Sequence, residues 1–160
     1  MDGAKPKGTS LVDLDLAPDL MMRGQDDPHG RDLLKRPPTV GQLAARIRDL
    51  AARPDGWWHL VGFDPAGPVR VPLDEVDGVR LWLTTWPPAH RTGVHDHVGT
   101  EVSIVIAGEL VEVSIAEEGV AERPLRANRV RVHGGTHTHE LTNPGPAFSI
   151  TLHAQLSPAA

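Results

Sequence analysis

The chain has 160 residues, enough for one domain with a buried core, and it has no cysteine, which excludes a disulfide framework and a thiolate ligand. Its formal net charge of -5 combines charges of both signs without a basic cluster, so no nucleic acid partner is expected. No apolar run follows the first residues as in a signal peptide, and no segment reaches the roughly 20 apolar residues of a membrane span. A cytoplasmic protein without membrane contact is therefore expected.

The chain divides into an N-terminal arm and a folded domain. Residues 1–38 are rich in Asp, Gly and Pro and hold no hydrophobic period, which predicts an irregular or partly mobile arm. Residues 39–160 are predicted to form the domain. It begins with a helix near residues 40–52, because Thr39 and Gln42 form a capping-box pattern and apolar residues then recur at helical spacing.

Short strands separated by Gly and Pro turns are predicted for the rest of the chain. The clearest strand covers residues 79–86, where side chains alternate with period two. Gly108 supplies a turn between two β-branched runs, and the double glycine at 134–135 separates two more. The predicted strands are 57–61, 69–73, 79–86, 102–107, 109–115, 130–133, 137–141 and 148–155. The pattern predicts an all-β sandwich or barrel after one helix.

The triplet His95-Asp96-His97 has the spacing of a metal site. In an extended segment alternate side chains point to the same face, so the two imidazoles lie together while Asp96 points away. Glu101 and Gly108 follow, giving the spacing H-x-H-x3-E-x6-G. Two imidazole nitrogens and a carboxylate oxygen suit Fe, Mn, Ni or Zn, so His95, His97 and Glu101 are candidate metal ligands.

This spacing resembles the first half of the signature of the cupin superfamily, whose second half, H-x3-N on a later strand, has a counterpart at residues 139–143. Within the superfamily the sequence is most similar to cysteine dioxygenase and related thiol dioxygenases. The likeness rests on Trp86, on TGVHDH at 92–97 and on TLHAQLSP at 151–158. It covers roughly residues 79–158 and implies an all-β cupin double-stranded β-helix, a small jelly-roll barrel with an N-terminal helix.

The resemblance also implies the metal ligands. It makes His139 the third histidine ligand beside His95 and His97. His137 has the same strand parity and stays an alternative, because it lies only about 7 Å away along a strand. In general cupins the residue matching Glu101 is a fourth ligand, whereas cysteine dioxygenases usually carry Cys or Gly there. Glu101 is expected as a ligand, with a surface or salt-bridged strand residue as the alternative.

Thr151, His153 and Gln155 stand at alternate positions of the last predicted strand and hence on one face. The matching positions of thiol dioxygenases hold Ser, His and Tyr, a hydrogen-bonded relay that reaches the bound substrate or O2. Gln155 cannot replace an acidic phenol, so a row that orients the substrate by hydrogen bonds is expected, with a half-buried polar strip as the alternative. No position clearly matches the family's carboxylate-binding arginine, and Arg70 and Arg80 are interpreted as solvated strand residues.

The resemblance implies a non-haem iron thiol dioxygenase, an enzyme that adds O2 to the sulfur of cysteine or a related small thiol to give a sulfinate. Fe(II) is the expected cofactor, with Mn, Ni, Co or Zn as alternatives. The departures at Glu101 and Gln155 leave a different thiol or amino-acid-like substrate open. Two other functions also stay open: a four-ligand metal cupin of the isomerase, lyase or decarboxylase type, and a non-catalytic cupin that binds a small molecule. The oligomeric state is open as well.

Overall fold

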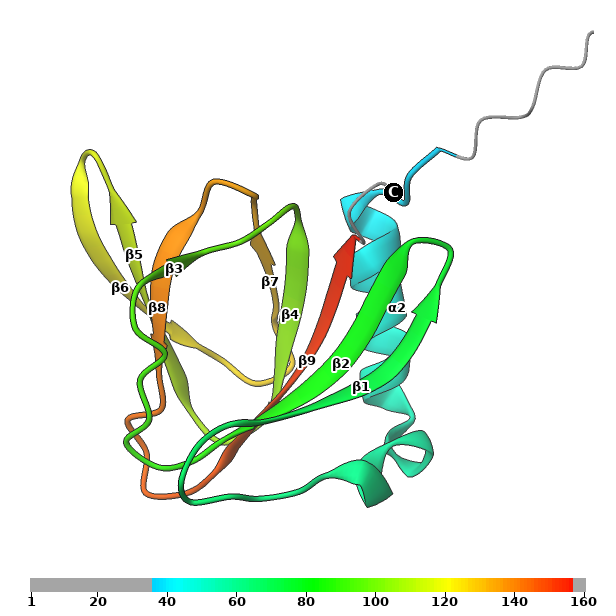
Figure 1. Ribbon diagram of the computed structural model, residues 1–160, viewed down its shortest axis with the longest axis horizontal. Coiled ribbons are helices and arrows are strands. Elements are labelled where there is room, and N and C mark those ends of the chain that lie inside the picture. Colours follow the sequence, from blue (N-terminus) through cyan, green and yellow to red (C-terminus); the bar gives the residue numbers. More distant parts are fainter. Residues whose placement is uncertain (1–35, 157–160) are drawn as a thin grey trace, which may run out of the picture. The chain divides into compact units, whose positions relative to one another are not determined.

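The computed structural model describes residues 36–156, so the predicted arm lies almost wholly outside the described residues and stays a prediction. The elements are α2 (Val40–Ala52), 3₁₀ turns at Pro54–Gly56 and Trp58–Leu60, β1 (Val69–Val76), β2 (Val79–Trp86), β3 (His95–Asp96), β4 (Glu101–Ala107), β5 (Leu110–Ala116), β6 (Gly119–Leu125), β7 (Val130–His133), β8 (Thr138–Thr142) and β9 (Ser149–Leu156) (Figure 1). No helix within residues 36–156 is long and apolar enough to cross a membrane.

The strands form two antiparallel sheets that face each other across a barrel (Figure 1). The five-stranded sheet has the order β1-β2-β9-β4-β7, and the four-stranded sheet has the order β3-β8-β5-β6. The strands β4 and β5 follow each other in the chain but belong to different sheets, so the chain crosses the barrel at Gly108. This arrangement is a jelly-roll barrel with an N-terminal helix, and the predicted fold class is confirmed.

The crossing between the sheets requires glycine at position 108. Gly108 has a φ of +79°, and a Cβ atom there would lie 2.5 Å from Ser149 Oγ and 2.7 Å from the carbonyl oxygen of Phe148. The Ser149 hydroxyl accepts a hydrogen bond from Glu109 N at 2.9 Å and donates one to Glu109 O at 2.6 Å. The turn is thereby bound to the start of β9.

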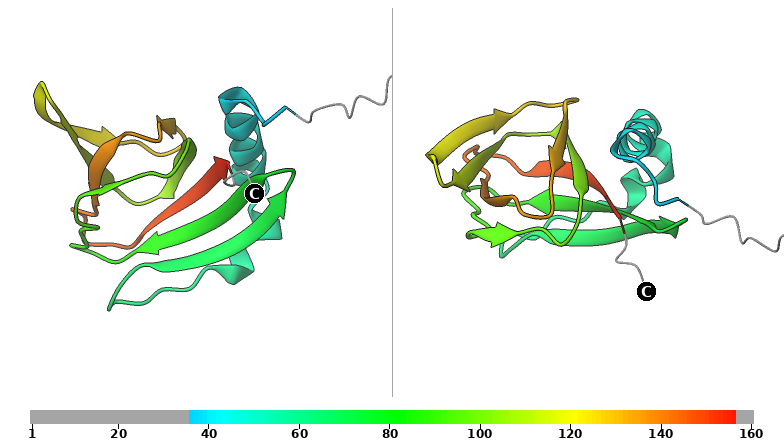
Figure 2. Two further views of the ribbon diagram at one scale, coloured as in Figure 1. Left: turned by 45° about the horizontal axis from the view of Figure 1, so that its top comes forward. Right: turned by 90° about the horizontal axis from the view of Figure 1, so that it is seen from above.

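The predicted helix and its capping box are confirmed. Gln42 N donates to Thr39 Oγ1 at 3.3 Å, and Thr39 N donates to Gln42 Oε1 at 2.7 Å. Leu43 and Ile47 are fully buried against the outer face of the five-stranded sheet (Figure 2). The core that they join consists of Leu43, Ile47, Trp57, Val79, Leu81, Leu83, Val102, Ile104, Leu152 and Ala154. Each such aliphatic side chain stabilises the fold by about 1.5–3 kcal/mol.

Strand parity separates this core from the barrel interior. Along β2, Leu81 and Leu83 join the core under the helix, whereas Trp82 and Thr84 line a cavity inside the barrel. The same alternation on β4 places Val102 in the core and Glu101 in the cavity. Because α2 takes over the main apolar packing on the outer face, the inner face can carry polar and ionisable groups.

Two sequence predictions differ from the structure. The predicted strand at 57–61 is wrong: residues there form 3₁₀ turns, and Trp57 closes the end of α2 by donating its Nε1–H to Leu50 O at 2.8 Å. The strand β6 was not predicted because its side chains up to Pro124 are exposed and show no apolar period. Proline is tolerated there because β6 is an edge strand.

Candidate metal centre

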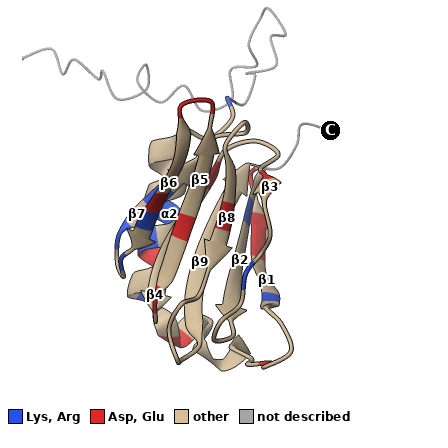
Figure 3. Ribbon diagram, turned by 90° about the vertical axis from the view of Figure 1, so that its left-hand side faces the viewer, with Lys and Arg blue, Asp and Glu red and all other residues tan. Residues whose placement is uncertain are grey.

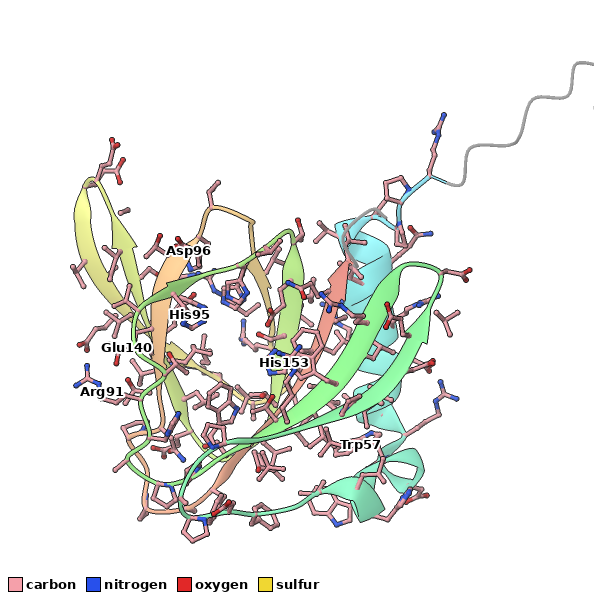
Figure 4. The ribbon with its side chains drawn as sticks, in the orientation of Figure 1. Trp57, Arg91, His95, Asp96, Glu140 and His153 are labelled. Carbon is pink, nitrogen blue, oxygen red and sulfur yellow. The ribbon has the colours of Figure 1, made fainter. Side chains whose placement is uncertain are left out.

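Three imidazoles converge inside the barrel. His95 on β3 pairs in register with His139 on β8, and His97 follows β3 directly. The Nε2 atom of His139 lies 2.7 Å from Nε2 of His97 and 3.2 Å from Nε2 of His95. Asp96 is exposed and points away from this group (Figure 4). Its carboxylate accepts a hydrogen bond from the Thr138 hydroxyl. The structure thus brings together the three histidines that the spacing singled out.

Each of the three rings has its other nitrogen next to a fixed acceptor. An acceptor at Nδ1 holds the proton on that nitrogen and leaves a lone pair on Nε2. The pairs are His95 Nδ1 with Gly93 O at 3.1 Å, His97 Nδ1 with Glu101 Oε2 at 2.8 Å, and His139 Nδ1 with Glu112 Oε1 at 2.9 Å. Three Nε2 lone pairs therefore face one another in the barrel.

This donor set fits a divalent metal ion. The Nε2 atom of His139 lies 2.7 and 3.2 Å from the other two Nε2 atoms, and their lone pairs repel one another unless a cation lies between them. Two ligand atoms at right angles around an ion, with bonds of about 2.1 Å, are about 3.0 Å apart. Neutral imidazole nitrogens suit Fe, Zn, Cu and Ni. The group His95, His97 and His139 can therefore hold a metal ion.

The fully buried Glu112 on β5 anchors His139 and is a residue that the sequence reasoning missed. Its Oε1 atom accepts from His139 Nδ1 at 2.9 Å, from His137 Nε2 at 2.7 Å and from His133 Nε2 at 3.0 Å. Its Oε2 atom accepts from Arg131 Nε at 2.7 Å. His137, the alternative ligand, thus bonds to Glu112. The available signal was a glutamate between two valines on a predicted strand.

The hydrogen bonds set the charges of these groups. Burial alone would raise the pKa of Glu112, but hydrogen bonds from His133, His139, Arg131 and His137 outweigh it and hold the pKa well below its ordinary range. Burial lowers the pKa of His139 and that of His133, against the hydrogen bond that each makes with Glu112. The region therefore combines an ionised carboxylate with neutral imidazoles, the form in which histidine binds metal.

Glu101 lies behind His97, on the side of the ring opposite Nε2. Its Oε2 atom accepts from His97 Nδ1 at 2.8 Å and its Oε1 atom from His153 Nδ1 at 2.7 Å. Burial would raise the pKa of Glu101, yet the hydrogen bonds from His153 and His97 hold it well below its ordinary range. His97, Glu101 and His133 also form a group whose ligand atoms lie within 4.8 Å of one another.

The polar row on β9 continues this network. Thr151 Oγ1 lies 2.7 Å from His153 Nε2 and accepts from Trp86 Nε1 at 2.8 Å. His153 keeps its proton on Nδ1, where it forms the hydrogen bond to Glu101. The other ring nitrogen of His153, Nε2, therefore accepts a hydrogen bond from the Thr151 hydroxyl. His95 and His153 come from opposite sheets and both point into the barrel (Figure 4). Thr151 and His153 therefore continue the hydrogen-bonded chain that holds His97.

A cavity of about 500 Å³ opens in front of His95 and His97 and contains two arginines. Arg80 donates from Nη2 to Gln155 Oε1 at 3.0 Å, and its buried Nε has no partner among the described residues. Gln155 in turn donates from Nε2 to Val98 O at 3.0 Å. Arg80 is thus held at the cavity wall, which corrects its interpretation as a solvated strand residue.

Arg70 and two aromatic rings complete this wall. The guanidinium carbon of Arg70 lies 3.9 Å from the ring centroid of Trp82, a cation–π contact. On the other side, Trp82 stacks on His153 with centroids 4.9 Å apart and planes inclined by 2°. Burial lowers the pKa of Arg70, against the charge of Glu101. The sequence could not show this position, because it depends on the pairing of β1 with β2.

Asn143, the last residue of the H-x3-N motif, has a structural role. Its Nδ2 donates to Trp86 O at 3.0 Å, to Pro87 O at 3.1 Å and to Ala147 O at 2.8 Å. Its Oδ1 accepts from Gly145 N at 3.0 Å. The residue therefore fixes the loops at the end of the barrel away from the histidines.

The comparisons with solved structures agree with the barrel. A cupin superfamily protein from Desulfitobacterium hafniense is 15% identical over 62% of this chain and 85% of its own, with a TM-score of 0.52. A protein from Thermus thermophilus is 18% identical over 63% of this chain and 94% of its own, with a TM-score of 0.54. An oxalate oxidase in complex with glycolate is 22% identical over 59% of this chain and 53% of its own, with a TM-score of 0.50. These likenesses show the cupin fold.

No curated protein sequence matches the chain. The sequence profile of one family, described as cysteine dioxygenase type I, matches residues 31–158. This match includes the helix, every strand of the barrel and the three converging histidines. The protein therefore belongs to the cysteine dioxygenase type I family.

Proposed function

We propose that the protein is a non-haem iron thiol dioxygenase, which adds both atoms of O2 to the sulfur of a small thiol and releases a sulfinate. The substrate class is a thiol that carries a carboxylate, with cysteine as the first candidate. The observation that carries this proposal is the convergence of three Nε2 lone pairs, from His95, His97 and His139, with every Nδ1 next to an acceptor. Membership of the family supports it.

The position of Glu101 supports three protein ligands rather than four. Both of its carboxylate oxygens bond to Nδ1 atoms, one of His97 and one of His153. With only His95, His97 and His139 as protein ligands, a bound ion would keep room for ligands from the substrate and for O2. Iron(II) bound there would supply a position for the thiolate and the electrons that activate O2.

The residues around the histidines would bind and orient the substrate. Arg80 and Arg70 place two guanidinium groups in the same cavity as His95 and His97, where a substrate carboxylate can form charge-assisted hydrogen bonds. The unpartnered Nε of Arg80 supports this role, because a buried N–H without an acceptor is costly. Gln155 holds Arg80 in place.

The row on β9 would act through position rather than by an acidic phenol. Gln155 orients Arg80, whereas Thr151 and His153 hold Glu101 and, through it, His97. Such partners of a ligand fix its ring orientation and raise its basicity. The Trp82 ring packs against His153 and forms part of the cavity wall.

Metal analysis of the purified protein followed by an oxygen electrode tests the proposal. We expect iron bound to the wild type, O2 uptake on addition of cysteine or another small thiol, and a sulfinate product. His139→Ala should lose both metal and O2 uptake, whereas His59→Ala, an exposed histidine in a 3₁₀ turn, should keep both. Tight binding of Zn, Mn or Ni without thiol-dependent O2 uptake would favour a non-oxidative metal cupin. Full metal content in a protein with both His95→Ala and His97→Ala would refute the site.

A further inference from the structure

A second cavity of about 410 Å³ lies between β6 and β7 and shares no lining residue with the cavity in front of the histidines. Its lining residues come from β4, β6, β7 and the connection between β6 and β7. They are Ser103, Val105, Arg123, Pro124, Leu125, Arg126, Arg129, Val130 and Arg131. Four of the nine are arginines and none is acidic. We name this space the arginine cavity.

The backbone holds the arginine-bearing connection against the barrel. Asn128 N donates to Val105 O at 2.9 Å, and Ala127 forms a parallel bridge with Val105. Arg129 N donates to Arg126 O at 3.3 Å, and Asn128 has a φ of +62° that tightens the turn. The arginines of this turn therefore stand on a fixed backbone.

The remaining two arginines come from strands on either side. Arg131 on β7 pairs in register with Ser103, a cavity residue of β4. Arg123 on β6 lies directly opposite the buried Glu112 in the strand register of β5 and β6. The two side chains therefore leave the sheet on the same, inner face. Basic residues accordingly gather where β6 and β7 lie near each other (Figure 3).

The positive charge in this cavity is largely uncompensated. Arg131 forms an ion pair with Glu112 at 2.7 Å, which fixes the direction of its guanidinium group. Within residues 36–156, Arg123, Arg126 and Arg129 form no ion pair with a carboxylate; the arginines that do are Arg46, Arg53, Arg91 and Arg131. A concave surface lined by one sign of charge raises the local concentration of counter-ions.

We propose that the arginine cavity is a second binding site and that it takes a small organic anion with two or more carboxylate or phosphate groups. Guanidinium groups bind both kinds of oxyanion through paired N–H donors. The apolar side chains Val105, Leu125 and Val130 offer contact to a carbon skeleton. The volume of about 410 Å³ is in the range of small-molecule sites.

Isothermal titration calorimetry tests this site independently of any turnover. The probes are tricarballylate, a tricarboxylate, and fructose 1,6-bisphosphate, which carries two phosphate groups, so that the two arms distinguish carboxylate from phosphate. We expect saturable binding of at least one probe by the wild type, and binding at least tenfold weaker after combined Arg123→Gln and Arg129→Gln. These two side chains are exposed, and a thermal unfolding scan checks that the variant stays folded. Arg126→Gln is a second variant, which should also weaken binding.

Two control variants locate the binding. Arg48→Gln, an exposed change on α2, removes the same charge outside the cavity and should leave the affinity within twofold of the wild type. Arg80→Gln tests whether the probes bind instead in the cavity of the histidines. It should also leave their affinity unchanged. Absence of binding for both probes would overturn the proposal. So would an equal loss in Arg48→Gln, which indicates diffuse attraction, or a loss only in Arg80→Gln. None of these results bears on whether the histidines hold iron.

Discussion

Replacing Glu112 by glutamine should weaken metal binding and destabilise the fold at the same time. The side chain is fully buried and accepts from three imidazoles at one oxygen and from Arg131 at the other. Glutamine keeps the shape but removes the negative charge and turns one acceptor into a donor. Both His139 and Arg131 then lose an ionised partner, and whichever of them faces the amide nitrogen also loses its hydrogen-bond acceptor.

The size of both effects follows from these contacts. Changing the residue that orients a metal-binding histidine typically lowers metal affinity about 10–100-fold, which corresponds to about 1.4–2.7 kcal/mol. A buried donor left without its acceptor costs about 1–3 kcal/mol of unfolding free energy. The Arg131 side chain is 26% exposed, so water can solvate it and the lower half of this range applies.

Chelator competition with cobalt(II) or iron(II) measures the affinity, and urea unfolding of the metal-free protein measures the stability. Glu118→Gln is the matched control, because it removes the same charge in the exposed turn between β5 and β6. It should leave both quantities near the wild-type values. A Glu112→Gln protein whose metal affinity stays within twofold of the wild type would refute the role assigned to Glu112.

Three further predictions follow from the structure. Gly108→Ala should lower the unfolding free energy by about 2–5 kcal/mol in a urea titration, because the left-handed backbone and overpacking against β9 both oppose a Cβ atom. The control Gly56→Ala has open space around it and should be nearly neutral. Arg80→Gln should raise KM for cysteine tenfold or more but leave KM for cysteamine, which lacks the carboxylate, almost unchanged; equal changes would contradict the carboxylate role. The metal-free protein should lose stability in urea titrations as the pH falls from 7 to 5. Burial lowers the pKa of His133 and His139 below 6.5, so the unfolded state binds more protons in this range, and stability that rose toward pH 5 would contradict this reasoning.

Local sequence patterns predicted most of the secondary structure. The helix at Val40–Ala52 follows from its cap residues, and β2 follows from strict alternation, since both signals arise between residues close in the chain. The strand predicted at 57–61 is wrong, because an apolar aromatic run can cover a helix end as well as enter a sheet. The edge strand β6 was not predicted, because its residues are held by pairing with β5 rather than by burial.

Local patterns indicated some residues of the candidate site and not others. The spacing of His95 and His97 and the motif at His139 pointed to the three converging rings. Glu112 was not singled out and Arg80 was interpreted as solvated, because no nearby residue reveals what either contacts. Glu112 stands 27 residues before His139 and reaches it through the pairing of β5 with β8. Arg80 reaches Gln155 through the pairing of β2 with β9, 75 residues apart.

By itself the sequence determined which side chains share a face, because the backbone of an extended strand turns alternate residues to opposite sides wherever the strand lies. It therefore selected the histidines and the polar row of β9. The tertiary structure decided what each face meets: a helix outside the five-stranded sheet, a carboxylate behind each of two imidazoles, and a cavity lined by four arginines. Those contacts depend on strand pairing and burial between distant parts of the chain, which no local pattern records.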